Sequence, residues 1–166
     1  MSSKRLGEIR KRSLAEQVTP PATKPFMDAA RALLKAGYLF GSHPSRPYLA
    51  HGLTLGQLDV LSALARADDA SLNCSEIAER TLITKGGITS ILDRLEARGL
   101  IKRIPSRDDR RSILVRLSPK GVAFFRKIYP EVARSNREMF EKAFGPAEMK
   151  EFGKLIALLV QSMEAQ

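Results

Sequence analysis

The spacing of apolar residues changes between positions 53 and 121, and this change predicts the order of the secondary-structure elements. The apolar residues of 88–95 recur at i, i+3, i+4 and i+7, as in a helix that buries one stripe. They are Ile88, Ile91, Leu92 and Leu95. The opposite face carries the small and polar residues Gly86, Thr89, Ser90 and Asp93. From residue 101 the pattern shortens and alternates, so 101–104 and 113–117 are predicted to be strands.

Polar residues at regular offsets mark where the helices of this region begin. The predicted caps are Thr54 with Gln57, Asn73 with Glu76, and Thr84 before a helix that starts at Lys85. Only a tight turn, 81–83, separates the last two helices, and Gly99 is placed to end the second of them. The segment 105–111 between the predicted strands is the charged tip of a hairpin. Two helices, a turn and a basic hairpin predict a winged helix-turn-helix, a module that places one helix in the major groove of DNA.

Several short runs in this region resemble the MarR family of bacterial transcription regulators. The runs are Gly52–Thr54, Leu61, Ser75–Ala78, Leu92–Glu96, Arg98–Ile101, Asp109–Ser112, Val115 and Leu117–Gly121. The match is dense from about Leu53 to Gly121 and looser in the flanking helices. The resemblance implies a homodimer in which the first and last helices of two subunits interleave. It also implies a small-molecule pocket between these helices and the winged helix.

The charge of the chain favours a polyanionic partner. The formal net charge is +10 and the isoelectric point is near 10.1. Residues 85–116 carry nine Lys or Arg against four Asp or Glu, and residues 1–24 carry six against two. We expect the first cluster to face DNA, the alternative being an ordinary solvated surface. For residues 1–24 we expect a basic, disordered arm, with a specific DNA-binding arm as the alternative.

Apolar stripes on both sides of the predicted winged helix indicate self-association. One lies in 25–38, and another follows Gly145-Pro146 with steps of three and four residues typical of paired helices. The expected dimer residues are Phe26, Leu33, Met149, Phe152, Ile156, Leu159 and Met163. Between the stripes, Ser118 and Pro119 begin a helix in which we expect Pro130 to cause a kink or a break. The alternative is that these helices complete a monomeric core.

These predictions give four regions and a set of DNA contacts. The regions are a basic arm (1–24), a dimerisation helix with a linker (25–52), a winged helix-turn-helix (53–118) and C-terminal dimerisation helices (119–166). The expected DNA-binding residues are Thr84, Lys85, Gly86, Gly87, Thr89, Ser90 and Arg94 on the helix, and Arg107, Arg110 and Arg111 in the wing. Asp109 is expected to support a wing arginine. Asp93 would repel phosphate, so we expect a nearby arginine to bind it. The alternative is that Asp93 is only a solvated residue of the helix face.

The MarR resemblance places an effector pocket near Tyr38, Phe40, Tyr48, His51 and Phe125. Core filling explains these aromatic residues equally well. The implied ligand is a small aromatic or anionic molecule that would shift the dimer between DNA-competent and incompetent forms. The resulting prediction is a transcription regulator that binds a pseudo-palindromic double-stranded DNA operator. We expect it to act as a repressor. A nonspecific or architectural DNA-binding protein is the alternative, because Gly86-Gly87 remove side chains from the reading surface. A winged helix that only contacts proteins should have an apolar or acidic outer face on its recognition helix, and the polar face of the helix that starts at Lys85 does not fit this alternative.

The sequence shows little that favours an enzyme, a cofactor or a membrane protein. It lacks a catalytic triad signature, a Gly-rich phosphate loop and paired metal ligands. His43 and His51 with Cys74 could ligate zinc, but we expect surface histidines and a small packed cysteine rather than a metal or redox site. No apolar run reaches membrane-spanning length. One cysteine excludes an internal disulfide, and we expect a cytoplasmic protein.

Overall fold

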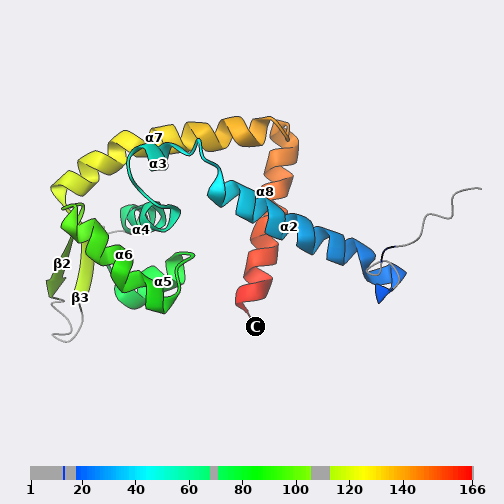
Figure 1. Cartoon of the computed structure of the whole chain (residues 1–166), viewed down its shortest axis with the longest axis horizontal. Coiled ribbons are helices and arrows are strands. Elements are labelled where there is room, and N and C mark those ends of the chain that lie inside the picture. The colour runs from blue at the N-terminus through cyan, green and yellow to red at the C-terminus, as the bar shows by residue number, and fades with distance from the viewer. Residues whose placement is uncertain (1–12, 14–17, 68–70, 106–112, 166) are drawn as a thin grey trace, which may run out of the picture. The chain divides into compact units, whose positions relative to one another are not determined.

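The computed structural model describes residues 13, 18–67, 71–105 and 113–165 (Figure 1). Their contacts divide the chain into two compact units, Met1–His43 and Pro44–Gln166. Most of the predicted basic arm lies outside the described residues, as do four predicted wing residues, Arg107, Asp109, Arg110 and Arg111. Within the described residues, no helix is both long enough and apolar enough to cross a membrane.

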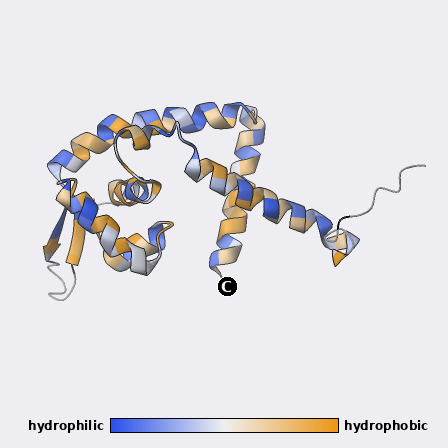
Figure 2. Cartoon of the chain, viewed as in Figure 1, coloured by the Kyte–Doolittle hydropathy of each residue, from blue (hydrophilic) through white to orange (hydrophobic). Residues whose placement is uncertain are grey.

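The described part of the first unit is essentially one long helix. A short 3-10 turn, η1 (Pro21–Thr23), leads into α2 (Lys24–Ser42), which has a proline in its first turn. Apolar and polar residues alternate around this helix at helical spacing (Figure 2). None of its residues is buried, and Phe26, Leu34 and Tyr38 each expose more than two thirds of their surface. The described residues of the first unit therefore do not bury the apolar stripe of α2.

The second unit begins with four helices that form the helix-turn-helix region. These are α3 (Pro47–Ala50), α4 (Leu55–Arg66), α5 (Cys74–Arg80) and α6 (Lys85–Ala97). Both predicted capping boxes are confirmed: Gln57 N–H donates to Thr54 Oγ1 at 3.3 Å, and Glu76 N–H donates to Asn73 Oδ1 at 2.9 Å. Their reciprocal bonds are 2.9 and 2.7 Å long. The short helix α3 was not predicted, because residues 41–52 contain turn formers rather than a helical apolar stripe.

One predicted cap is wrong in its chemistry. Thr84 occupies the N-cap position of α6, but its hydroxyl makes no capping hydrogen bond. Its backbone carbonyl instead accepts from Gly87 N–H at 2.9 Å. The α6 start is therefore correct by position, while the side-chain bond that the threonine suggested is absent. At the other end Gly99 has a φ of 69°, the left-handed conformation expected of a residue that ends a helix.

The predicted hairpin is confirmed and has a third strand beside it. β2 (Ile101–Pro105) and β3 (Ile113–Leu117) pair antiparallel, with Ile101 opposite Leu117 and Pro105 opposite Ile113. β1 (Ser71–Asn73) pairs antiparallel with the other side of β3, so the strand order is β1-β3-β2. β1 was not predicted. It has only three residues, and the cap signal at Asn73 conceals it.

Two long helices complete the second unit. α7 (Pro119–Glu141) is capped by Ser118, whose Oγ accepts from Gly121 N–H at 2.9 Å, as predicted. It runs uninterrupted through Pro130, so a break does not occur there. α8 (Pro146–Glu164) begins where predicted, and the Glu148 carboxylate accepts from Gly145 N–H at 2.7 Å.

One core joins the helix-turn-helix, the sheet and α7. Its completely buried side chains come from α4, α5, α6, β2, β3 and α7, and they include Leu61, Leu64, Ile77, Leu92, Leu95, Ile101, Val115 and Ile128. The start of α7 lies so close to the connection between α6 and β2 that a Cβ on Gly121 would be 1.9 Å from the Leu100 carbonyl oxygen. A glycine is therefore required at this point by close packing.

Candidate nucleic-acid interface

Helix α6 separates a buried face from a polar, exposed face. Ile88, Leu92 and Leu95 are buried in the core. Opposite them, four residues are exposed, and we call this set the reading face: Gly86, Thr89, Ser90 and Arg94. All four were predicted as DNA-binding residues. A helix with this division can present polar groups to a groove while its other side remains fixed.

The first turn of α6 leaves its backbone accessible. A Cβ added to Gly86 would meet nothing within 4 Å, and one on Gly87 would meet Ile83 at 3.4 Å. Lys85 is the first residue of the helix, and its side chain lies outside the described part of the chain. The two glycines thus leave the N-terminal turn open to a close approach by a ligand or a phosphate group.

Arg103 of β2 holds the acidic residues at the C-terminal half of α6. Its guanidinium donates to Asp93 Oδ1 at 2.7 Å and to Glu96 Oε2 at 2.5 Å, and its backbone N–H donates to Glu96 Oε1 at 3.1 Å. Desolvation lowers the pKa of Arg103, but the bonds and charges of the two carboxylates outweigh it and raise that pKa above its usual value. The prediction that an arginine holds Asp93 is confirmed. Sequence reasoning did not identify which arginine, because the partner lies on a strand.

A second arginine fixes the C-terminal end of α6. Arg98 donates to the carbonyl oxygens of Gly52 and His51 at 2.8 and 3.0 Å, and its guanidinium carbon lies 5.5 Å from the centre of the Phe124 ring. Lys120 Nζ donates to the Arg98 carbonyl at 2.7 Å. These contacts tie α6 to α7 and to the turn before α4. The sequence analysis did not assign this role to Arg98.

The two faces of the hairpin carry different charges. Arg103 lies on the face that packs against α6, and its charge is neutralised there. Lys102 and Arg116 lie directly opposite each other on the outer face, and both are exposed. Neither residue was predicted as a site residue. The strand register that brings them together is not visible from the charge count alone.

The residues of the predicted effector pocket fall into both units. Tyr38 and Phe40 lie on α2 in the first unit. In the second unit, Tyr48 is buried in the core and Phe125 stacks on Tyr129 with ring centres 4.7 Å apart. His51 Nε2 lies 3.1 Å from Glu131 Oε2, and its ring packs edge-on against Phe124. The pocket itself stays a prediction.

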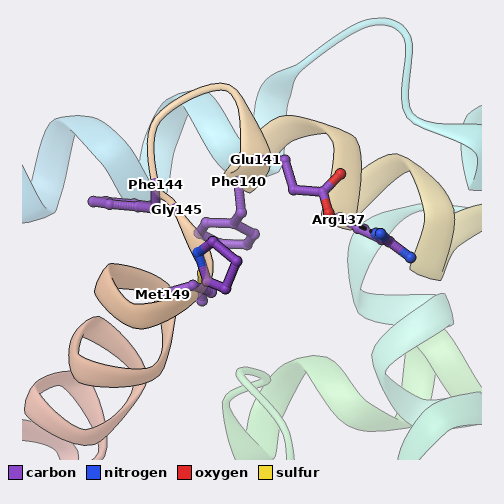
Figure 3. Close-up of a pocket in the computed structure, with 7 residues that line it drawn as sticks. Arg137, Phe140, Glu141, Phe144, Gly145 and Met149 are labelled. Atoms are coloured by element: carbon purple, nitrogen blue, oxygen red, sulfur yellow. Dashed lines mark hydrogen bonds and ion pairs between the residues drawn. The ribbon is translucent and has the colours of Figure 1, made fainter.

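A hollow of about 660 Å³ lies elsewhere, at the corner between α7 and α8 (Figure 3). Phe140, Phe144 and Met149 supply most of its apolar lining, and the remaining lining residues are Arg137, Glu141, Gly145 and Pro146. Arg137 Nε donates to Glu141 Oε1 at 2.7 Å, and this carboxylate raises the pKa of Arg137. The hollow thus offers an apolar surface beside a charge pair that is already satisfied.

The predicted dimer residues on α8 lie along a largely uncovered stripe. Met149, Phe152 and Ile156 are half-buried, with Phe152 stacked on Phe144 at 4.9 Å. Further along, Leu158, Leu159 and Met163 expose 63%, 41% and 65% of their surface. Phe26 and Leu33 of α2 are also exposed within their own unit. The stripe of α8 therefore remains available to another surface along its second half.

Among the described residues, no group of three or more His, Cys, Asp or Glu is arranged to hold a metal ion. Cys74 is exposed at the first position of α5, so the expected packed cysteine is wrong. The buried residue of α5 is Ile77, one turn further along the helix.

A helix-turn-helix followed by a β-hairpin is the architecture of winged helix DNA-binding proteins. The family model described as "MarR family" matches residues 51–112. The HTH-type transcriptional regulator YfiV of Bacillus subtilis is 30% identical over 112 residues, which are 68% of each chain. The chain belongs to the MarR family, a family of transcription regulators rather than enzymes.

Two further comparisons define the extent of the similarity. The HTH-type transcriptional regulator PrsX of Escherichia coli is 35% identical over 79 residues, 48% of this chain and 48% of PrsX. The chain thus matches about half the length of that curated relative. The crystal structure of Sco3205, a MarR family transcriptional regulator from Streptomyces coelicolor in complex with DNA, superposes with a TM-score of 0.76. It shares 21% identity and covers 84% of this chain and 88% of its own, a likeness of fold.

Proposed function

We propose that this chain regulates transcription by binding a pseudo-palindromic double-stranded DNA operator as a homodimer. The observation that carries the proposal is the reading face of α6, which is polar and exposed while the opposite face is fixed in the core. In this proposal Thr89 and Ser90 contact base edges, and Arg94 contacts the backbone or a guanine. The open first turn at Gly86 and Gly87 receives a phosphate group. Sco3205, which shares the fold, was crystallised with DNA.

The wing contributes the second set of DNA contacts in this proposal. Arg107, Arg110 and Arg111 lie in the segment between β2 and β3, with Asp109 as the supporting acid. Arginine side chains are attracted to narrow minor grooves by the electrostatic potential there, so the wing would sense DNA shape. The described strands on either side of this segment pair antiparallel, with Pro105 opposite Ile113.

The homodimer is supported by apolar surface that a single chain leaves exposed. α8 exposes Leu155, Leu158 and Met163, and α2 exposes Phe26 and Leu34, each by more than half. Large contiguous apolar surfaces mark interaction sites. A two-fold dimer would place its two recognition helices in successive major grooves, roughly 34 Å apart.

The proposal includes a repressor role in the cytoplasm and control by a small aromatic or anionic effector. The family membership supports this part. The hollow of about 660 Å³ at the corner of α7 and α8, which is lined by other residues than the predicted pocket, is within the usual size of small-molecule sites. Such a ligand would act by favouring one separation of the two recognition helices over another. A panel of benzoic and phenolic acids, scored by the shift in melting temperature, tests it. Shifts that also change DNA affinity support an effector role.

A nonspecific DNA-binding protein is the second candidate. Gly86 and Gly87 remove side chains from the helix end nearest the groove, and the net charge of +10 supplies sequence-independent affinity. A specific regulator and a nonspecific binder differ in whether any DNA sequence is enriched over others.

Selection from random-sequence duplexes separates these candidates. The test uses the native chain, an Arg110→Ala/Arg111→Ala variant, and Arg126→Ala/Lys127→Ala on the exposed side of α7 as a control of equal charge. Enrichment of a two-fold symmetric motif, with affinity lost only in the wing variant, supports the regulator. Steeply salt-dependent binding without a motif favours the nonspecific candidate. Absence of binding at low salt by a folded dimer contradicts both.

A further inference from the structure

The outer face of the three-stranded sheet carries two neighbouring cations that form no ion pair with any other described residue. Lys102 of β2 and Arg116 of β3 are directly opposite, and Ser71 of β1 lies on the other side of Arg116. Side chains of paired residues point to the same face of a sheet, and neighbouring strands lie about 4.8 Å apart. The two cations are therefore side by side on one exposed row. The next row of the same face contains Ile104, Leu114 and Asn73.

Like charges placed directly opposite destabilise a sheet unless something neutralises them. Among the described residues, neither Lys102 nor Arg116 forms an ion pair. The adjacent residue Arg103 shows the contrast, because it turns to the other face and is bound by Asp93 and Glu96. Within the described part of the two strands, the cation on the inner face is therefore neutralised, whereas the two on the outer face are not.

Protection of a sheet edge does not account for this pair. A lysine on an edge strand discourages edge-to-edge pairing, which would explain Lys102 on β2. Arg116, however, lies on β3, which is the central strand between β1 and β2. A central strand has no edge to protect, so edge protection does not explain the charge of Arg116.

We propose that Lys102 and Arg116 form a phosphate-contacting surface that extends the DNA interface from the reading face and the wing tip onto the outer face of the sheet. The inference rests on the proposed DNA-binding function and adds a contact to it. Arg116 can bind one phosphate with two parallel N–H groups, and Lys102 supplies a second, more flexible charge. The Ser71 hydroxyl is placed in the same row as a further donor. The formal net charge of +10 favours the phosphate backbone of a nucleic acid over an acidic protein segment as the partner.

Salt-dependent binding to a mixed-sequence DNA duplex tests this surface. Phosphate contacts carry no sequence information, so the probe does not need to contain the operator. The variant is Lys102→Gln/Arg116→Gln, and the matched control is Arg126→Gln/Lys127→Gln, which removes one lysine and one arginine from exposed positions of α7. Each lost phosphate contact lowers the slope of log affinity against log salt by about 0.9. We expect the variant to lose about 2 from the slope per subunit, while the control keeps the native slope.

The melting temperature of each variant shows whether folding is intact. Removal of a repulsive pair predicts that Lys102→Gln/Arg116→Gln melts at the native temperature or above it. A variant slope equal to the native slope overturns the proposal and makes an acidic peptide the next partner to test. Equal losses in variant and control also overturn it, since net charge alone would then explain the effect. If the native, folded dimer binds no duplex at low salt, the proposed function fails as well.

Discussion

The winged-helix region buries its apolar side chains, whereas helix α8 leaves many of its own exposed. In the former, Leu61, Leu92 and Val115 are completely buried within a single chain. In α8, Leu155, Leu158 and Met163 expose more than half of their surface, although their helical spacing is just as regular. Regular apolar spacing therefore predicts a helix in both places but does not tell which surface covers it. The first region is complete in one chain, and the second is the part for which we propose a partner subunit.

The largest effect is expected where the winged-helix core is most tightly packed. Gly121→Ala would place a Cβ 1.9 Å from the Leu100 carbonyl oxygen, so the backbone of α7 must move away from the connection between α6 and β2. We expect a loss of about 3 kcal/mol in the free energy of unfolding, measured by urea denaturation. Gly153→Ala in α8 is the control, because its Cβ meets nothing within 4 Å. Equal stability of the two variants would contradict the close approach.

A charge on the exposed stripe of α8 is expected to disrupt the proposed subunit interface. Leu158→Glu puts a carboxylate into the exposed stripe, where it would have to be desolvated at a subunit interface at a cost of several kcal/mol. We expect sedimentation to show monomers, and the winged-helix region to keep its cooperative unfolding. Lys154→Glu, on a side chain already paired with Glu151 at the surface, serves as the control. A dimer that survives Leu158→Glu would exclude this stripe from the interface.

The contact between the wing and α6 is expected to matter more for DNA affinity than for stability. Arg103→Gln leaves Asp93 and Glu96 without their cation on the helix that faces DNA. The pair with Asp93 is partly exposed, so we expect a stability loss of only about 1 kcal/mol. The two unpaired carboxylates should repel phosphate. If this repulsion costs about 1.4 kcal/mol of binding free energy, DNA affinity falls about tenfold. Arg103→Lys should restore only part of this affinity, because the ammonium group of lysine lacks the planar fork of donors with which arginine binds both carboxylates. Full DNA affinity in Arg103→Gln would show that the ion pairs of Arg103 with Asp93 and Glu96 have no part in DNA binding.

The smallest effect is expected at the open end of α6. Gly86→Ala adds a methyl group into free space and restricts the unfolded chain, which should stabilise the fold by about 0.5 kcal/mol. If a phosphate approaches the backbone there, the same change should lower DNA affinity several-fold. The two readouts are melting temperature and a binding titration. A variant that is both more stable and equally tight in binding would place the DNA away from this turn.

The sequence predicted most elements of the fold because their signals are local. The boxes at Thr54 and Asn73, the cap at Ser118 and the stop at Gly99 all depend on residues within a few positions of each other. It missed β1, which is defined by pairing with a strand more than forty positions away. The cation pair of Lys102 and Arg116 was missed for the same reason, because it depends on strand register. The exposure of Cys74 was missed because position in a helix does not fix which face turns inward.

The missing side-chain cap of α6 has a consequence for the exchange of its amide hydrogens. Helices α4, α5 and α7 each satisfy a first-turn amide with the side chain of Thr54, Asn73 or Ser118. In α6 the hydroxyl of Thr84 does not do so, and the first turns of helices carry several amides without an internal partner. These protons should exchange with solvent deuterium faster than those of the neighbouring helices in the free protein. On DNA they should become the most strongly slowed amides of the helix, so that the footprint of an operator can be recorded on the protein itself.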